Sequence, residues 1–287
     1  STLSSSSAAS DVYKRQMKRN ERLVDFTNFL INHPNQMLNL NELSKHYEVA
    51  KSSISEDLVF IKRVFENQGV GLVETFPGSL GGVRFTPYIT DERSLEMSQE
   101  IAELLREENR ILPGGYIYLS DILGTPSNLR KIGQIIAHEY HEKQVDVVMT
   151  IATKGIPIAQ SVAEILDVPF VIVRRDPKVT EGATLNVNYM SGSSSRVENM
   201  TLSKRSLSIG QNVLIVDDFM KGAGTINGMR NLVHEFDCLL AGVAVFLEGP
   251  FKGERLIDDY KSILKVDRID IANRSIDVQL GNIFNDK

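Results

Sequence analysis

The segment VLIVDDFMKGAGT, residues 213–225, constrains the fold more than any other part of the chain. Four apolar residues open it, which is typical of a buried strand, and Asp217 and Asp218 stand at the strand's carboxyl end, outside the core. A loop of small residues follows and leads into a helix. Ligands of open α/β sheets bind at the carboxyl ends of strands, so the pattern predicts a ligand site here.

This loop has the chemistry of a monophosphate site. Small residues leave backbone N–H groups unobstructed, the helix N-terminus adds its positive dipole end, and the Thr225 hydroxyl can donate a hydrogen bond. The carboxylates accept hydrogen bonds from vicinal hydroxyls such as those of a ribose, directly or through a hydrated divalent cation. The residues predicted to bind the ligand are Asp217, Asp218, Phe219, Met220, Lys221, Gly222, Ala223, Gly224 and Thr225.

The C-terminal two thirds of the chain alternates apolar runs with amphipathic stretches. The runs predict strands at 145–151, 170–173, 213–216 and 239–246, and the stretches predict helices at 129–141, 156–166 and 226–236. Such alternation is typical of an α/β fold with a mainly parallel sheet flanked by helices.

Two of these loops resemble loops of type I phosphoribosyltransferases. In that family a strand ends in an acidic pair and a small-residue loop ends in threonine, as at 213–225, and this signature binds phosphoribosyl pyrophosphate (PRPP). Residues 150–157, TIATKGIP, resemble the family's pyrophosphate loop, which implies that the diphosphate contacts Ala152, Thr153, Lys154 and Gly155. The polar stretch 174–208 matches the position of the loop that closes over PRPP. Mg²⁺ is a candidate ion to accompany PRPP.

The N-terminal part carries the pattern of a winged helix-turn-helix. Helical spacing predicts helices at 19–32 and from about residue 41, and Ser53 and Glu56 have the spacing of a capping box that starts a third helix. A hairpin follows, with strands at 70–76 and 83–85. The third helix of this fold enters the major groove, so double-stranded DNA is the expected partner. The predicted DNA contacts are Lys51, Ser52, Ser53, Ser55 and Arg84.

These patterns predict two domains, and an apolar content of 42% is enough for each to bury a core. The winged-helix domain is expected at 17–90, a connecting region with a helix over 91–112 at 91–115, and the phosphoribosyltransferase-like domain at 116–287. The serine-rich stretch 1–16 is interpreted as a non-native tail. The apolar residues of the connecting helix are expected to pack between the domains or against a second subunit; they are Met97, Ile101, Leu104 and Leu105.

The cysteine content and hydropathy indicate a soluble protein of a reducing cytoplasm. Cys238 is the only cysteine, so no intramolecular disulfide forms, and the sequence contains no Cys/His cluster with metal-ligand spacing. No apolar run approaches the roughly 20 residues that span a bilayer. No role in a membrane is expected.

Lys221 departs from the enzymes of the family. Purine salvage enzymes usually carry a small residue or an aspartate there, and the aspartate accepts a proton from the base, which a cationic lysine cannot do. A lysine beside the 5′-phosphate instead strengthens ground-state binding, which suits a sensor. The base-recognising hood of the enzymes is not identifiable beyond Phe246. We therefore expect a phosphoribosyltransferase fold without catalytic activity.

From Met17 onward the chain resembles the purine operon regulator family of low-GC Gram-positive bacteria. The resemblance rests on the winged-helix pattern, the acidic-pair loop and Lys221. It implies a homodimer that binds control sites upstream of purine genes and responds to PRPP. It leaves open whether the protein represses or activates, and whether other phosphate-rich nucleotides, such as guanosine tetraphosphate, share the pocket.

Three alternatives compete with this interpretation. The first is an active purine phosphoribosyltransferase with an accessory N-terminal domain, and the second is an RNA-binding antiterminator built on the same fold. The third is that the winged helix binds a protein partner. Its eight basic residues at 17–90 are matched by eight acidic ones, and phosphate contacts supply most non-specific DNA affinity. The domain is therefore expected to bind DNA poorly as a monomer.

Overall fold

A computed structural model gives the fold and describes residues 17–78, 81–176, 182–190 and 197–285. The chain divides between Pro87 and Tyr88 into two compact units. The expected non-native tail, the tip of the expected hairpin at 79–80, and residues 177–181 and 191–196 lie outside the described residues.

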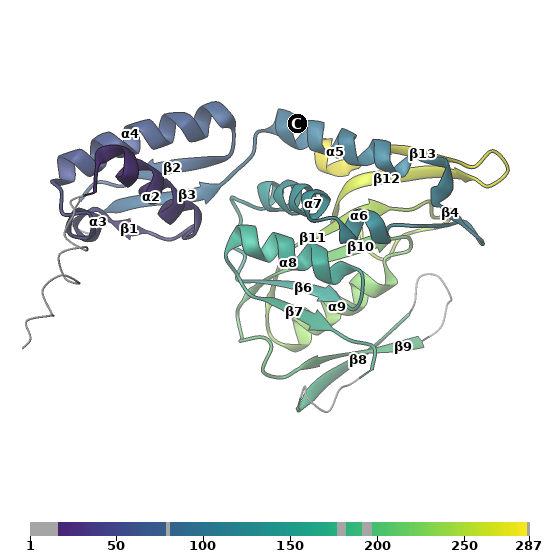
Figure 1. The fold of residues 1–287 in the computed structure, drawn as a ribbon. Helices are drawn as coiled ribbons and strands as arrows, with labels where there is room; N and C mark the ends of the chain where they lie inside the picture. The colour runs from purple at the N-terminus through teal and green to yellow at the C-terminus, as the bar shows by residue number, and fades with distance from the viewer. Residues whose placement is uncertain (1–16, 79–80, 177–181, 191–196, 286–287) are drawn as a thin grey trace, which may run out of the picture. The chain divides into compact units, whose positions relative to one another are not determined.

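The first unit contains three helices and a hairpin in the predicted order. Its elements are α2 (Arg19–Ile31), β1 (Leu38–Asn39), α3 (Leu40–His46), α4 (Lys51–Gln68), β2 (Gly71–Thr75) and β3 (Gly82–Pro87). β3 pairs antiparallel with β1 and with β2 in a three-stranded sheet (Figure 1). The predicted stripe of α4 is buried together with Phe26 and Leu30 of α2; it comprises Ile54, Leu58, Ile61 and Phe65.

The start of α4 differs from the prediction. The N-cap residue is Ala50, in an extended conformation, and no side chain caps the helix. Ser53 lies inside the first turn, where its N–H donates to the carbonyl of Ala50 at 3.0 Å. The predicted capping box is therefore wrong, because the helix begins two residues before the serine that was expected to start it.

The second unit is an α/β domain built on a six-stranded sheet. Its helices are α5 (Asp91–Leu105), α6 (Ser120–Gly124), α7 (Pro126–Glu139), α8 (Gly155–Leu166) and α9 (Gly224–Glu235), with 3₁₀ turns η1 (Glu108–Arg110) and η3 (Asn282–Phe284). Its strands are β4 (Ile111–Leu112), β5 (Tyr116–Ile117), β6 (Val147–Ile151), β7 (Phe170–Val173), β8 (Thr184–Met190), β9 (Val197–Ser203), β10 (Asn212–Met220), β11 (Leu239–Glu248), β12 (Lys261–Asp270) and β13 (Ser275–Leu280).

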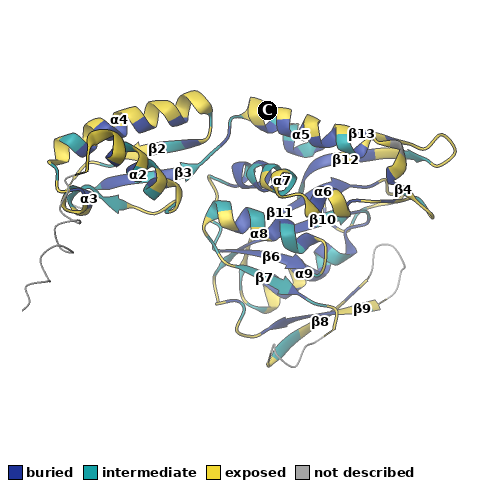
Figure 2. Ribbon diagram, viewed as in Figure 1, coloured by how far each residue is buried: buried dark blue, intermediate teal, exposed yellow. Residues whose placement is uncertain are grey.

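The predicted parallel sheet is confirmed. Its strand order is β13-β12-β11-β10-β6-β7, and every pairing is parallel except that of the edge strand β13 (Figure 1). On β10, Leu214 and Val216 join the core cluster that contains α7 and α8, whereas Val213 and Ile215 join the cluster that contains α9. The alternation follows from the two-residue period of a strand and buries the sheet on both faces (Figure 2).

The helix expected over 91–112 ends at Leu105 and belongs to the second unit. Met97, Ile101 and Leu105 are buried in that unit's own core, and Leu104 is partly buried against it. The sequence predicted that these residues pack between the domains or against a second subunit. They pack instead within the core of the second unit itself. The remainder of the predicted helix forms η1 and β4, because Pro113 and two glycines at positive φ, Gly114 and Gly115, make the turn that joins β4 to β5.

Two further findings bear on the predicted site. Phe246, the one residue assigned to a base-recognising hood, is fully buried on β11 in the cluster shared with α7, so it offers no face to a ligand. The strand predicted at 213–216 runs on to Met220.

Among the described residues, no helix has both the length and the apolar character needed to cross a membrane.

Candidate functional site

The acidic pair lies inside β10 rather than beyond it. Asp217 keeps a parallel pairing with Val245 of β11 and is only 5% exposed, whereas Asp218 is half-buried. The prediction that both carboxylates stand outside the core is therefore wrong for Asp217. The reason is that β11 continues alongside β10 as far as Glu248 and supplies backbone partners for the additional strand residues.

The carboxyl groups of Asp217 and Asp218 are close enough to shift each other's pKa. The N–H of Asp218 donates to Oδ1 of Asp217 at 2.9 Å. Burial, and then the charge of Asp218, raise the pKa of Asp217 well above the ordinary aspartate value of 3.8. Burial also raises the pKa of Asp218, although its hydrogen bond with Asp217 and the charge of Lys154 oppose the increase. Burial and the neighbouring charge therefore favour the neutral form of Asp217 more than they would for a solvent-exposed aspartate.

The loop between β6 and α8 packs against Asp217 through Gly155. A Cβ at Gly155 would stand 2.2 Å from Oγ1 of Thr150 and 3.1 Å from Oδ1 of Asp217, so the position requires glycine. The Thr150 hydroxyl is buried and has no hydrogen-bond partner within the described part of the chain. Within the same loop, the peptide bond between Ala152 and Thr153 is cis. This close contact between the loop and β10 places Lys154 near the acidic pair, where its charge acts on Asp218.

Two adjacent pockets open at this end of the sheet. The first, of about 220 Å³, is lined by Tyr116, Arg175, Asp217 and residues 219–226, which include the whole small-residue loop. The second, of about 120 Å³, is lined by residues 115–117, Leu119, Lys154, Asp218, Phe219 and Lys221. The pockets share Tyr116, Phe219 and Lys221, so three cationic side chains and two carboxylates converge on one hollow.

The loop that follows β10 is shaped as a helix entrance. Ala223 adopts a left-handed conformation, with φ 62°, and serves as the N-cap of α9, which begins at Gly224. No side chain caps this helix. The first backbone N–H groups of α9 and the Thr225 side chain are thus at the pocket wall, where an anion is favoured by the helix dipole.

Of the four residues predicted to contact a diphosphate, Lys154 lines one of these two pockets and the others do not. Ala152 and Thr153 lie outside them, and Gly155 instead gives room to Asp217. Arg175 lines the first pocket and forms an ion pair with Glu198 of β9 at 3.4 Å. The stretch expected to close over the ligand contains the antiparallel pair β8 and β9.

Tyr116 is a pocket residue that the sequence analysis missed. It is 66% exposed on β5, and Nζ of Lys221 lies 5.5 Å from its ring centroid and 5.7 Å from that of Phe219. These distances are within the range of cation–π contacts. The sequence feature that could have indicated this residue is the Pro-Gly-Gly turn at 113–115 just before it. We interpreted that turn as the end of a helix, but it joins the two short strands β4 and β5.

The predicted DNA contacts occupy two different surroundings in the first unit. Lys51, Ser52 and Ser55 are exposed in the first turns of α4, and Ser53 is half-buried. Arg84 lies on β3 directly opposite Glu74, to which its Nη2 donates at 2.9 Å, and its guanidinium stacks over Phe76 at 5.0 Å. Lys51 has no ion-pair partner within the described residues, whereas the charge of Arg84 is already compensated.

A buried ion pair accounts for two more basic residues of this unit. Asp57 of α4 is fully buried and accepts hydrogen bonds from Nε of Arg22 at 2.6 Å and Nε of Arg19 at 3.1 Å. This ion pair joins α2 to α4. Among the predicted DNA contacts, the uncapped N-terminus of α4 with the exposed Lys51 is therefore the part that is free to bind an anion.

Both units match models of known families. Residues 18–87 match the N-terminal domain of the bacterial purine repressor, and residues 119–281 match the phosphoribosyl transferase domain. A crystal structure of adenine phosphoribosyltransferase from Thermoanaerobacter pseudethanolicus aligns with 52% of this chain and 87% of its own, at 22% identity and a TM-score of 0.47.

Two relatives that match nearly the whole chain are named as regulators of purine biosynthesis. The chain is 54% identical to the probable purine biosynthesis transcriptional regulator PurR of Streptococcus pneumoniae, over 94% of this chain and 99% of the relative. It is 51% identical to the purine biosynthesis transcriptional repressor PurR of Bacillus subtilis, over 94% of each. A xanthine phosphoribosyltransferase of Streptococcus pyogenes is 29% identical over 53% of this chain. The chain therefore belongs to the family of bacterial purine biosynthesis transcriptional regulators, in which a purine-repressor N-terminal domain precedes a phosphoribosyltransferase domain.

Proposed function

We propose that the chain regulates purine biosynthesis genes by binding double-stranded DNA through its first unit, under the control of PRPP bound to its second unit. We further propose that the second unit transfers no phosphoribosyl group. The family membership supports the DNA-binding regulator. The observation that carries the effector proposal is the convergence of Lys154, the acidic pair and the small-residue loop on one hollow.

The hollow matches the charge distribution of PRPP. Backbone N–H groups at the start of α9 and Lys221 suit a 5′-phosphate, Lys154 and Arg175 suit a diphosphate, and Asp218 suits the ribose hydroxyls. Burial favours the neutral form of Asp217, and a ligand that donates a hydrogen bond to this carboxyl would favour its ionised form.

The described residues contain no cluster of three or more side chains that could hold a metal ion. Two carboxylates are present at the pocket, Asp218 and the more buried Asp217. One or two carboxylates are sufficient for Mg²⁺ when a bound phosphate and water provide its other oxygen ligands. We therefore propose that Mg²⁺ enters only as a companion of PRPP.

Loss of transferase activity is proposed from the surroundings of Lys221. Its ammonium group lies between the rings of Tyr116 and Phe219 at the pocket wall, and it stands where the enzymes have a small residue or a proton-accepting aspartate. A cation there stabilises bound phosphate but cannot accept a proton from a purine. The competing function, an active transferase, has the relationship to xanthine phosphoribosyltransferase in its favour.

The DNA side of the proposal relies on the N-terminus of α4. Its uncapped N–H groups, three serines and Lys51 offer donors to phosphates and base edges. Lys18, Lys45 and Arg63 also have no ion-pair partner among the described residues, but the eight basic residues at 17–90 are matched by eight acidic ones, so one copy would bind DNA weakly. We therefore propose that a homodimer, with two such helices, is the binding form.

Two measurements test these statements. The first is binding of the full chain to duplex DNA from purine promoters, at one fixed salt concentration, with and without PRPP. A PRPP-dependent change in affinity is expected, with no equivalent binding to single-stranded RNA. Equal affinity with and without PRPP would remove the effector from the proposal and leave the regulator.

The second measurement is release of pyrophosphate from PRPP in the presence of each purine base. No release above background is expected. Turnover at roughly 1 per second or more is an ordinary enzyme rate and would establish the competing function.

A further inference from the structure

The segment that follows β11, residues 249–260, supports the small-residue loop from the side away from the pocket. Three consecutive carbonyls of that loop accept hydrogen bonds from this segment. The N–H of Gly249 donates to Met220 at 2.8 Å, Nε of Arg255 donates to Lys221 at 2.9 Å, and the N–H of Leu256 donates to Gly222 at 3.4 Å. The loop backbone is therefore held by a row of donors.

This arrangement orients the amides of the loop. In a planar trans peptide the N–H of each residue points opposite to the carbonyl of the residue before it. The three carbonyls face residues 249–256, so the N–H groups of Lys221, Gly222 and Ala223 point the other way. These three residues line the first pocket. The supporting segment thus directs donors toward the position proposed for a 5′-phosphate.

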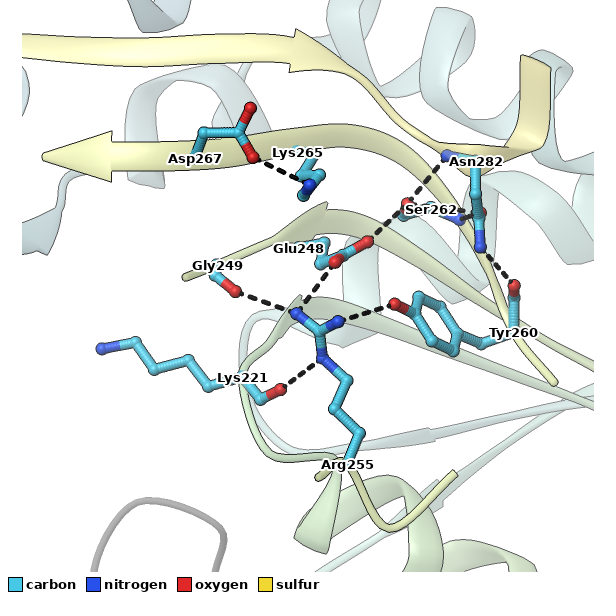
Figure 3. Close-up of polar contacts among 9 residues, drawn as sticks. All are labelled: Lys221, Glu248, Gly249, Arg255, Tyr260, Ser262, Lys265, Asp267 and Asn282. Atoms are coloured by element: carbon cyan, nitrogen blue, oxygen red, sulfur yellow. Dashed lines mark hydrogen bonds and ion pairs between the residues drawn. The ribbon is translucent and has the colours of Figure 1, made fainter. Parts of the chain in front are cut away.

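Arg255 provides the side-chain contact in this row, and a buried carboxylate anchors it (Figure 3). Its Nη2 lies 2.8 Å from Oε1 of Glu248 and donates to the carbonyl of Gly249 at 3.2 Å, while Nη1 donates to the Tyr260 hydroxyl at 3.1 Å. Burial, and then the charge of Glu248, raise the pKa of Tyr260 to about 12, which keeps this phenol neutral. All three guanidinium nitrogens are thus engaged.

Glu248 is itself buried and hydrogen-bonded on the side opposite to Arg255. It is 4% exposed at the end of β11, in register with Met220 of β10, and its Oε2 accepts a hydrogen bond from the Ser262 hydroxyl at 3.1 Å. The pair keeps one geometry because each nitrogen of the half-buried Arg255 and each carboxylate oxygen of the buried Glu248 has a partner, and loss of Arg255 would leave the Glu248 charge buried and uncompensated. Neither Glu248 nor Arg255 lines the two pockets.

We propose that Arg255, anchored by Glu248, is a positioning residue that turns the amides of the small-residue loop toward the pocket and so sets affinity for the 5′-phosphate end of the effector. The inference rests on the proposed function of the pocket. The diphosphate end is assigned to Lys154 on a different loop, and among the described residues the hydrogen bonds and the ion pair of Arg255 go to Lys221, Glu248, Gly249 and Tyr260 and not to that loop. The two ends of the ligand should therefore respond differently to a change at Arg255.

The test uses two probes, ribose 5-phosphate and inorganic pyrophosphate, titrated calorimetrically into the full chain. Arg255→Gln should weaken ribose 5-phosphate by about tenfold or more, the effect of losing one well-made hydrogen bond to a charged group. Pyrophosphate affinity should stay within about twofold. Arg255→Lys keeps the cation beside Glu248 and one donor for Lys221, so it should recover part of the loss. Arg268→Gln, at a largely exposed arginine of β12, is the matched control and should change neither affinity.

The possible outcomes distinguish a failure of the pocket's proposed function from a failure of the positioning role of Arg255. If the parent chain binds neither probe, the proposed function of the pocket fails, and the positioning role fails with it. If the parent binds both probes and Arg255→Gln weakens them equally, Arg255 is a stabilising residue only. Unchanged ribose 5-phosphate affinity in Arg255→Gln would also overturn the positioning role. Should Arg255→Gln fail to fold, the same comparison in Arg255→Lys decides, with a loss confined to ribose 5-phosphate expected.

Discussion

Asp218 donates its backbone N–H to the carboxylate of Asp217 at 2.9 Å, so the two acids of the pair are linked through the chain as well as by charge. Burial raises the pKa of Asp217, which means that the folded state binds a proton that the unfolded state has released. This contribution to stability is fully present below the ordinary value of 3.8 and is lost as pH rises through the higher folded value.

Asp217→Asn should therefore stabilise the free protein and flatten this pH dependence. An amide reproduces the shape of the protonated acid, keeps an oxygen that accepts from Asp218, and cannot ionise. The melting temperature of the variant should exceed that of the parent near neutral pH, with about 2–4 °C for each kcal/mol gained, and the two should converge at acidic pH. Thermal scans from about pH 4 to about pH 8 test this, and a variant that melts lower than the parent at every pH would contradict it.

Asp218→Asn should weaken ligand binding and give a smaller gain in stability than Asp217→Asn, because the pKa of Asp218 is raised less strongly than that of Asp217. Asp218 is half-buried at the pocket, where its carboxylate is assigned to the ribose hydroxyls. An amide accepts such hydrogen bonds more weakly, so PRPP affinity should fall by about tenfold or more. Calorimetry measures the affinity, and DNA binding in the absence of PRPP serves as the control that should remain at the parental value. Parental PRPP affinity would show that the ribose contact is assigned wrongly.

Lys221→Met should weaken PRPP by about tenfold or more, because the methionine keeps the apolar stem between Tyr116 and Phe219 but removes the charge offered to phosphate. The matched control is Lys143→Met. Its ammonium lies 5.2 Å from the Tyr140 ring, in a similar aromatic contact away from both pockets. Equal PRPP affinity in the parent and Lys221→Met would mean that the lysine is solvated and contributes no phosphate contact.

Local patterns in the sequence were sufficient to predict the strands β6, β7, β10 and β11 and the helices α7, α8 and α9. The apolar runs on β6, on β10 and on the second half of β11 are buried on both faces, and that on β7 is half-buried at the sheet edge, so each is a continuous apolar run that can be recognised without knowledge of its neighbours. β12 and β13 escaped prediction because one face of each is exposed, and their alternating residues resemble a polar loop. A long apolar run is a stronger local signal than a short alternating one.

What the sequence could not supply was long-range contact. The extra length of β10 depends on β11 beside it, so Asp217 was placed outside the core although it is buried. Tyr116 reaches the pocket from a short hairpin that precedes the sheet, and Arg255 reaches the loop from the segment after β11. Neither is part of a motif, because each acts by its position in space and not by its spacing from the acidic pair.

Asp57→Asn should loosen the first unit by breaking its buried ion pair. The change leaves Arg22 with a buried, uncompensated charge, which costs on the order of 3 kcal/mol. Hydrogen exchange of the α4 amides should accelerate accordingly, while the second unit keeps its protection. Glu56→Gln, at an exposed partner of Arg19 one residue earlier, should change stability by no more than about 0.5 kcal/mol. Unchanged exchange in Asp57→Asn would show that the pair adds nothing to the stability of this unit.

The last prediction concerns the docking of α4 on DNA, for which Lys51 and Lys62 form a matched pair on one helix. Lys51 is exposed at the uncapped N-terminus without an ion-pair partner among the described residues, whereas Lys62 faces Glu66 at 3.7 Å further along. Lys51→Ala should lower affinity for purine promoter DNA and reduce the slope of log K against log salt by about 0.9, the value for one phosphate contact.

Lys62→Ala should leave both the affinity and the slope at their parental values, and PRPP binding should be unaffected in either variant. Arg84→Ala should have a smaller effect than Lys51→Ala, because Glu74 already compensates that guanidinium, and Glu74→Gln should raise DNA affinity by releasing it. Fluorescence anisotropy over a series of salt concentrations measures all four variants. If Lys51→Ala binds DNA with the parental affinity and slope, the N-terminus of α4 does not approach phosphates, and a protein partner becomes the better explanation of the winged helix.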